Sequence, residues 1–198
     1  MKIDMKKSRE IIREEAQIAA VRSDFRRLAL MHEPSEAVQM AAIQQSWAAL
    51  QYIHKPSDSV KFAALKRSGC ALQYIHNPTY DMQKIAASNS GLSLRYNRGA
   101  CESIKMIAVS NDPSALKYIE EPSESLQLAA VRKDWRSIQY LHNPSEEVQM
   151  AALEQDERAI QYFKRAWVKE EPAVEYTVEQ LEELLGKKIK IVGGTSNM

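Results

Sequence analysis

The chain repeats one pattern of apolar and polar residues with a period of 22 residues. The period is marked by Pro34, Pro56, Pro78, Pro122 and Pro144, and Ala100 stands where the missing proline would be. Extended back to Ile12, it defines seven gapless repeats: 12–33, 34–55, 56–77, 78–99, 100–121, 122–143 and 144–165. Alanine occupies repeat position 9 and Leu or Ile occupies repeat position 17 in all seven. This regularity predicts one structural unit stacked seven times.

Each repeat predicts two short helices. Apolar residues at repeat positions 5, 8 and 9 have helical spacing, so we expect a first helix over about positions 1–11, with proline as its first residue. In the last repeat we expect Asn143 to cap this helix and Glu146 to return a bond. Position 13 is Asp or Ser in every repeat, which predicts an N-cap and a second helix over about positions 14–21. Positions 17 and 20, with a mostly small residue at 16, would form its buried face.

Helices this short are unstable alone, so the predicted fold class is all-α: an α-solenoid of seven 22-residue helix-turn-helix repeats with a short C-terminal helical cap. We expect residues 1–11 to form an N-terminal helical cap and residues 12–165 to form the solenoid. Residues 166–192 would form a C-terminal capping segment, with a helix from Thr177 through Leu185 and an extended stretch near Lys190. Residues 193–198 would be a flexible tail.

Units such as NPSEEVQMAALEQDERAIQYFK resemble a family of short two-helix repeats of unknown function, found mainly in bacteriophage, bacterial and large DNA virus proteins. The resemblance covers residues 12–165, and the closing LEELLGKKIKIV is similar to how such proteins end. It implies a stacked helical fold and brings no activity or catalytic residue with it. A bacteriophage origin would imply action on host machinery, most concretely as a host-defence antagonist that inhibits a bacterial immune complex.

Composition narrows the class of protein. The chain has 27 Lys and Arg against 26 Asp and Glu, and this balance argues against bulk coating of nucleic acid. No apolar run reaches the ~18 residues of a membrane span, and the first residues lack a secretory signal. Two cysteines, Cys70 and Cys101, fit a reducing compartment. We therefore expect a cytoplasmic protein, in the host cytoplasm if the protein is viral.

The sequence predicts neither a metal site nor an enzyme. All four histidines occupy repeat position 21, so adjacent copies should lie about 10 Å apart and cannot share one ion. We expect them at helix C-termini, where they can bond free carbonyls. No serine pairs uniquely with a histidine, the glycine-rich phosphate loops are absent, and no cofactor is predicted. If the chain were an enzyme, a helical-repeat DNA glycosylase would be the class to consider.

The candidate binding surface is one face of the second helix. On an α-helix, repeat positions 14, 18 and 21 lie on one side, and position 14 varies as Phe, Trp, Gly, Gly, Pro, Trp, Glu. We expect an open groove at the two glycines, flanked by two tryptophan anchors. The candidate residues are Trp47, Gln51, His54, Gln73, His76, Arg95, Arg98, Lys117, Trp135, Gln139 and His142. Two alternatives stay open: the tryptophans cover the seam between repeats, or partners bind the glutamine row at position 6 of the first helix.

The predicted function is a non-enzymatic scaffold for protein–protein interaction, as a monomer or weak homo-oligomer. The alternative is a helical-repeat nucleic-acid-binding protein that uses the basic centre of the third and fourth repeats. Residues 56–99 carry six Lys and Arg against two Asp, a net charge of +4. The candidate phosphate contacts there are Lys66, Arg67, Arg95 and Arg98.

Overall fold

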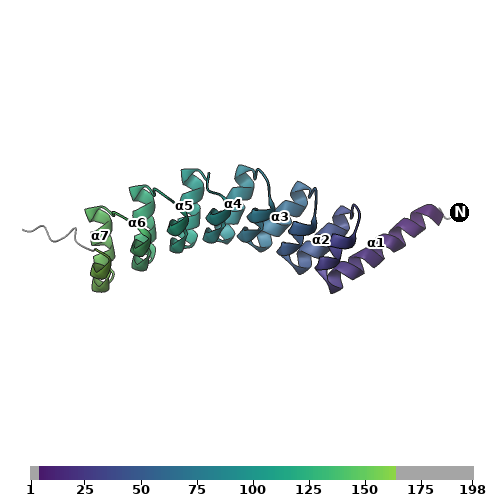
Figure 1. Cartoon of the computed structure of the whole chain (residues 1–198), viewed down its shortest axis with the longest axis horizontal. Helices are drawn as coiled ribbons and strands as arrows, with labels where there is room; N and C mark the ends of the chain where they lie inside the picture. The colour runs from purple at the N-terminus through teal and green to yellow at the C-terminus, as the bar shows by residue number, and fades with distance from the viewer. Residues whose placement is uncertain (1–4, 164–198) are drawn as a thin grey trace, which may run out of the picture. The chain divides into compact units, whose positions relative to one another are not determined.

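The computed structural model describes residues 5–163, and every element in that range is helical (Figure 1). Each repeat contributes one α-helix and one 3₁₀ helix. The α-helices are α1 (Met5–Ser23), α2 (Glu36–Gln45), α3 (Asp58–Arg67), α4 (Tyr80–Asn89), α5 (Glu102–Asn111), α6 (Glu124–Lys133) and α7 (Glu146–Leu153). The 3₁₀ helices are η1 (Phe25–Leu30), η2 (Trp47–Tyr52), η3 (Gly69–Tyr74), η4 (Gly91–Tyr96), η5 (Pro113–Tyr118), η6 (Trp135–Tyr140) and η7 (Glu157–Tyr162). The expected helix from Thr177 and strand near Lys190 lie outside the described residues.

The α-helices α2 to α7 begin two residues later than the sequence predicts, whereas α1 extends into residues 1–11 as expected. The residue after the repeat proline is the N-cap. In the second, third, fourth and sixth repeats its hydroxyl accepts a hydrogen bond from the backbone amide three residues on, as at Ser35 with Val38 (3.4 Å). The proline precedes this cap, so its expected place as first helical residue is wrong. In the last repeat the N-cap is Ser145, so the prediction of Asn143 is wrong as well. A hydroxyl at repeat position 2 is placed to meet the amide of position 5, which explains the start at position 3.

The second helix of each repeat is 3₁₀, where an α-helix is expected. It spans repeat positions 14–19, and the cap at position 13 accepts from the amide two residues on, as at Ser46 with Ala48 (3.3 Å). Three residues per turn place positions 14, 17 and 20 in one row, with 15 and 18 in the next. Position 21 lies beyond the end of the helix. The predicted alignment of positions 14, 18 and 21 is therefore wrong.

The core lies between the two helical layers of successive repeats. The position 9 alanines of the second to seventh repeats are fully buried, and position 17 is at most 3 % exposed from Leu28 to Ile138. Within residues 5–163, each helix contacts only helices of its own repeat and of the adjacent repeats. This is the packing of a solenoid, so the predicted all-α repeat fold is confirmed.

Polar side chains join neighbouring α-helices at both ends. At the N-terminal end, the cap hydroxyl also donates to a glutamate of the preceding repeat, as Ser123 does to Glu102. At the C-terminal end, the Asn89 amide donates to the Leu65 carbonyl (2.8 Å), and the Gln155 amide donates to the Val131 carbonyl (2.6 Å). These bonds satisfy helix-end groups that would otherwise lack partners, and they fix the register between repeats.

Across residues 5–163, no helix is both long and apolar enough to cross a membrane. The longest helix, α1, has 19 residues but carries charged residues along its length.

Candidate functional site

The glycines at repeat position 14 do not open a groove. Gly69 and Gly91 are buried, and a Cβ added to Gly69 would lie 2.2 Å from the carbonyl oxygen of Ala86. At Gly91 the added Cβ would lie 2.5 Å from the carbonyl oxygen of Ala108. The missing side chains let the next α-helix approach closely. The expected open centre at these glycines is therefore wrong.

The aromatic residues at position 14 pack on the next repeat. The Trp47 ring lies 6.2 Å from the Tyr74 ring, and the Trp135 ring lies 6.2 Å from the Tyr162 ring, centroid to centroid. Trp135 is only 8 % exposed, so it cannot serve as a surface anchor as predicted. This geometry favours the alternative in which the tryptophans cover the seam between repeats.

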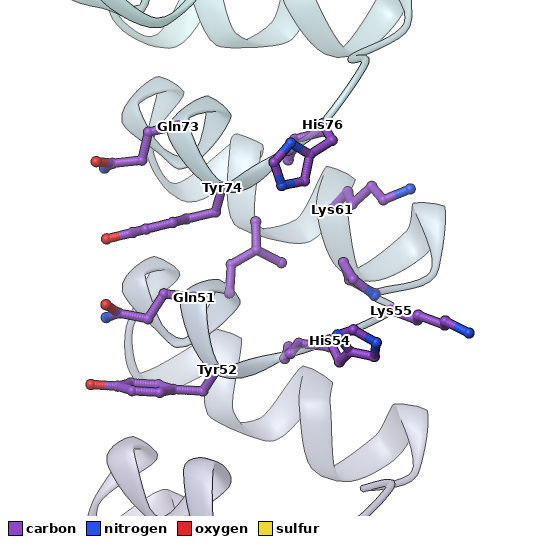
Figure 2. Close-up of a pocket in the computed structure, with 12 residues that line it drawn as sticks. Gln51, Tyr52, His54, Lys55, Lys61, Gln73, Tyr74 and His76 are labelled. Carbon is purple, nitrogen blue, oxygen red and sulfur yellow. The ribbon is translucent and has the colours of Figure 1, made fainter.

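A row of tyrosines forms the most regular exposed feature. Repeat position 19 is tyrosine in all repeats after the first: Tyr52, Tyr74, Tyr96, Tyr118, Tyr140 and Tyr162. Their side chains are half-buried or exposed, and none of their hydroxyls hydrogen-bonds to another residue in the range 5–163. Figure 2 shows two of these rings extending to the same side of the molecule, each beside the glutamine of position 18. The fold therefore presents a row of phenol hydroxyls, one in each repeat after the first.

A groove lies beside this row between the second and third repeats. This first groove has a volume of about 690 Å³, and its floor contains Leu50, Ile53 and Ile75. The glutamine and tyrosine side chains lie on one side of it and the histidine and lysine side chains on the other (Figure 2). The polar lining residues are Gln51, Tyr52, His54, Lys55, Lys61, Gln73, Tyr74 and His76.

An equivalent groove lies two repeats further on. This second groove has a volume of about 830 Å³, and its floor contains Leu94, Leu116 and Ile119. The Lys117 ammonium lies 5.0 Å from the centre of the Tyr118 ring, a cation–π contact. The polar lining residues are Arg95, Arg98, Lys105, Lys117, Tyr118, Glu120, Glu121, Tyr140 and His142.

The grooves bring together most of the predicted residues. Eight of the eleven candidates line one groove or the other: Gln51, His54, Gln73, His76, Arg95, Arg98, Lys117 and His142. Trp47, Trp135 and Gln139 line neither groove. The Gln139 amide donates to the Arg136 carbonyl (2.9 Å) on the surface.

The sequence analysis did not single out the tyrosines or three lysines of the grooves, Lys55, Lys61 and Lys105. The signal for the tyrosines was their recurrence at position 19, which was read only as regularity of the repeat. The signal for Lys61 and Lys105 was their position, because they are the two breaks in the glutamine row at position 6.

The glutamine row of the α-helices has a structural role. The Gln39 amide donates to the carbonyl of Pro34 (2.8 Å), and the Gln127 amide donates to that of Pro122 (2.9 Å). The same bond recurs in the fourth and seventh repeats. Each bond ties the α-helix to the proline of its own repeat, which does not support the row as the binding surface.

The predicted nucleic-acid contacts do not form one patch. Lys66 lines a different groove, of about 640 Å³, between α3 and α4, together with Lys84 and Asn89. That groove shares no residue with the second groove, where Arg95 and Arg98 lie. The basic centre that the sequence suggests is therefore divided between two surfaces.

The remaining titratable groups do not assemble a reactive centre. Within residues 5–163, no three His, Cys, Asp or Glu side chains are grouped so as to hold a metal ion. The four histidines are exposed and make no hydrogen bond to another described residue, so the expected bonds to helix-end carbonyls are not formed. The Cys101 thiol accepts or donates a hydrogen bond with Ser103 (3.2 Å), which lowers its pKa, and it lies outside both grooves.

In comparisons with known proteins, no protein-family model, no curated protein and no solved structure matches the chain. The resemblance to bacteriophage repeats therefore rests on the repeat motif alone.

Proposed function

We propose that the chain is a non-enzymatic scaffold that binds a partner protein along its tyrosine face. We define the tyrosine face as repeat positions 18, 19 and 21 of the second to sixth repeats, together with the two grooves that they border. The observation that carries the proposal is the row of phenol hydroxyls that form no bond within residues 5–163. Tyrosine is enriched at protein interfaces, where its ring packs and its hydroxyl bonds the partner.

Packing within the repeat does not by itself explain why position 19 is tyrosine. Tyr52, Tyr74 and Tyr162 stack on an aromatic residue of the preceding repeat. Tyr96, Tyr118 and Tyr140 follow repeats with Gly or Pro at position 14 and have no such ring, yet they are still tyrosine. Phenylalanine would fill the same space without a polar group. A hydroxyl at this position in every repeat after the first is expected of a surface that hydrogen-bonds to a partner.

The absence of a unique polar cluster in the described residues supports a binding role over catalysis. The residues that line the first groove recur at the same repeat positions in the second, with changes of charge. A catalytic site needs one constellation of acid, base or nucleophile that differs from its surroundings. A repeated surface is suited instead to an extended partner.

The class of partner follows from the resemblance to bacteriophage repeats. A phage-encoded scaffold would act in the cytoplasm of the infected bacterium on a host protein. We therefore propose a protein of a bacterial immune complex as the first partner to test, with inhibition as the consequence of binding.

Removal of the hydroxyls tests the proposal without removing the rings. The partner is first captured from a bacterial host lysate with the full chain and identified by mass spectrometry. Purified partner is then titrated against the triple variant Tyr96→Phe, Tyr118→Phe, Tyr140→Phe. Loss of about 1 kcal/mol per hydrogen bond predicts at least about tenfold weaker binding with an unchanged melting temperature.

A tyrosine outside the face provides the control. Tyr80 on α4 is 51 % exposed, and its hydroxyl lies 3.3 Å from the Ser103 hydroxyl. Tyr80→Phe should leave partner binding unchanged. Equal binding by the triple variant and the wild type would show that the tyrosine face is not the interface.

A further inference from the structure

Four cations line the second groove. None of the Arg95, Arg98, Lys105 and Lys117 side chains forms an ion pair with another described residue. Five cations elsewhere in the described residues do form ion pairs, among them Arg158 with Asp156 (2.6 Å). Glu120 and Glu121 also line the second groove, so its four Lys and Arg and its two Glu side chains sum to +2.

Lys105 departs from the repeat pattern, because position 6 is glutamine in most repeats. Where a repeat begins with proline and has glutamine at position 6, the glutamine amide donates to the carbonyl of that proline, as at Gln83 and Gln127. In the fifth repeat the proline is replaced by Ala100, and the lysine makes no hydrogen bond to a described residue. Lys105 is half-buried and lines the groove, and no described carboxylate forms an ion pair with it. A bound carboxylate would supply that missing counter-charge.

The first groove repeats the arrangement with less free charge. Its position 6 residue, Lys61, is the other break in the glutamine row, and it pairs with Asp58 (2.7 Å). The two lysines are separated by 44 residues, or two repeats. At about 8–10 Å per layer of packed helices, two repeats advance by roughly 20 Å. An extended chain covers that distance in about six residues at ~3.3 Å each.

We propose, on the basis of the scaffold function above, that the two grooves bind one extended acidic segment of the partner protein. Its first cluster of carboxylates binds the cations of the second groove, and a second cluster about six residues away binds beside Lys61. Apolar side chains between the clusters pack on the tyrosine rings. The Gln73 amide already donates to the Cys70 carbonyl (3.1 Å), so its Oε1 is left to accept from the segment's backbone.

The charges favour a protein segment over nucleic acid. Glu120 and Glu121 line the second groove and would repel a continuous phosphate backbone. A peptide can place carboxylates opposite the cations and neutral residues opposite the glutamates. Apolar residues and tyrosines also line both grooves, and apolar side chains of a peptide can pack against them.

The first test uses synthetic peptides and the full chain. A fluorescein-labelled peptide with two Glu-Glu pairs centred six residues apart and a Leu between them is titrated by fluorescence anisotropy at 50 and 200 mM salt. We expect binding that weakens with salt and is at least about tenfold weaker when every Glu is replaced by Gln. A peptide with the pairs three residues apart should bind more weakly. Equal binding of the Gln peptide overturns the proposal, and equal binding at the short spacing overturns its two-groove form.

The second test replaces the cations with residues that the repeat uses elsewhere. Arg95→Gln, Arg98→His, Lys105→Gln and Lys117→Gln each introduce the common residue of that repeat position. The fourfold variant should keep the wild-type melting temperature and bind the acidic peptide at least about tenfold more weakly. Lys66→Gln with Lys84→Gln, in the groove between α3 and α4, should change nothing. A single-stranded DNA of 15 thymidines serves as the rival ligand. If this DNA binds the wild-type chain more tightly than the acidic peptide does, and the fourfold variant does not bind it, the groove binds nucleic acid and the proposal is wrong.

The two proposals can fail separately. The captured partner could bind the fourfold variant normally and bind the Tyr→Phe triple variant much more weakly. In that case the scaffold function holds and the proposal of an acidic segment is wrong. If the partner binds both variants normally, the tyrosine face is not the interface and both proposals fail.

Discussion

At the scale of single residues, repeat position 14 packs against the next repeat in two different ways. Where the residue is aromatic, as in Trp47, the ring fills the seam and stacks on the next tyrosine. Where it is glycine, as in Gly69 and Gly91, the backbone of the next α-helix moves into the space that a side chain would occupy. The variation that suggests a binding site in the sequence therefore reflects packing.

Adding one methyl group tests this packing. Gly91→Ala would place a Cβ 2.5 Å from the Ala108 carbonyl oxygen, a distance that requires the backbone to shift. We expect a loss of about 1–3 kcal/mol in the free energy of unfolding, measured by urea denaturation. Gly99→Ala is the matched control, because nothing lies within 4 Å of its added Cβ, and its effect should stay within about 0.5 kcal/mol. Equal stability of the two variants would show that Gly91 is not needed for close approach.

Two glutamines of the sixth repeat allow a hydrogen bond in the half-buried interior to be compared with one on the surface. Gln127 is half-buried and donates to the Pro122 carbonyl (2.9 Å), whereas Gln139 is exposed and donates to the Arg136 carbonyl (2.9 Å). Gln127→Ala should cost about 1–2 kcal/mol because it leaves a half-buried carbonyl without its donor. Gln139→Ala should cost less than about 0.5 kcal/mol. Chemical denaturation of both variants checks the difference, and the reverse order would contradict it.

At the scale of elements, the short 3₁₀ helix determines which side chains reach the surface. Its tighter turn puts positions 14, 17 and 20 against the core and leaves position 18 outside. The helix ends before position 20, so the residues at position 21 border the grooves from the bend that follows it. The tyrosine face is a consequence of this geometry, since an α-helix would distribute the same residues differently.

The cap of η7 predicts a dependence on pH. Hydrogen bonds from the Arg158 guanidinium (2.6 Å) and backbone amide (2.9 Å) lower the pKa of Asp156 from an ordinary 3.8 to about 2. Because the folded pKa is the lower one, the stabilisation is present above about pH 3.8 and is lost as the pH falls towards 2. The melting temperature of Asp156→Asn should be below wild type at pH 6, and the gap should shrink by pH 2.

Replacement of the partner cation checks the cause of that shift. In Arg158→Ala, the pKa of Asp156 should rise towards 3.8, as followed by carbon NMR of its carboxylate. A value that stays near 2 would mean that the guanidinium is not the main cause.

At the scale of the whole molecule, contacts between adjacent repeats carry the stability of residues 5–163. No helix in that range touches a repeat beyond its neighbours. A defect in one repeat should therefore weaken that repeat and the next, while distant repeats keep their structure.

Truncation of a seam residue tests this local behaviour. Trp135 is 8 % exposed and packs on Tyr162, so Trp135→Ala should cost about 3–5 kcal/mol. Amide hydrogen exchange should rise in the sixth and seventh repeats and stay at the wild-type rate in the second and third. A uniform rise across all repeats would indicate a single cooperative unit instead.

The architecture could be predicted from the sequence because it depends on spacing. The 22-residue period, the alanine at position 9 and the caps at position 13 require only local geometry and burial, and the structure has them where the pattern places them. Burial of positions 17 and 20 follows from the same apolar pattern. The grooves were located in part, since Arg95, Arg98 and Lys117 stood out as departures from the repeat.

Only the tertiary structure decided the type of the second helix and the meaning of position 14. Six residues after an N-cap are compatible with an α or a 3₁₀ turn, and the apolar pattern does not distinguish them. Whether Gly69 opens a space or admits a neighbour depends on where Ala86 lies, and Ala86 belongs to the next repeat. A repeat pattern specifies each unit, whereas the fit between units depends on distances that no single unit contains.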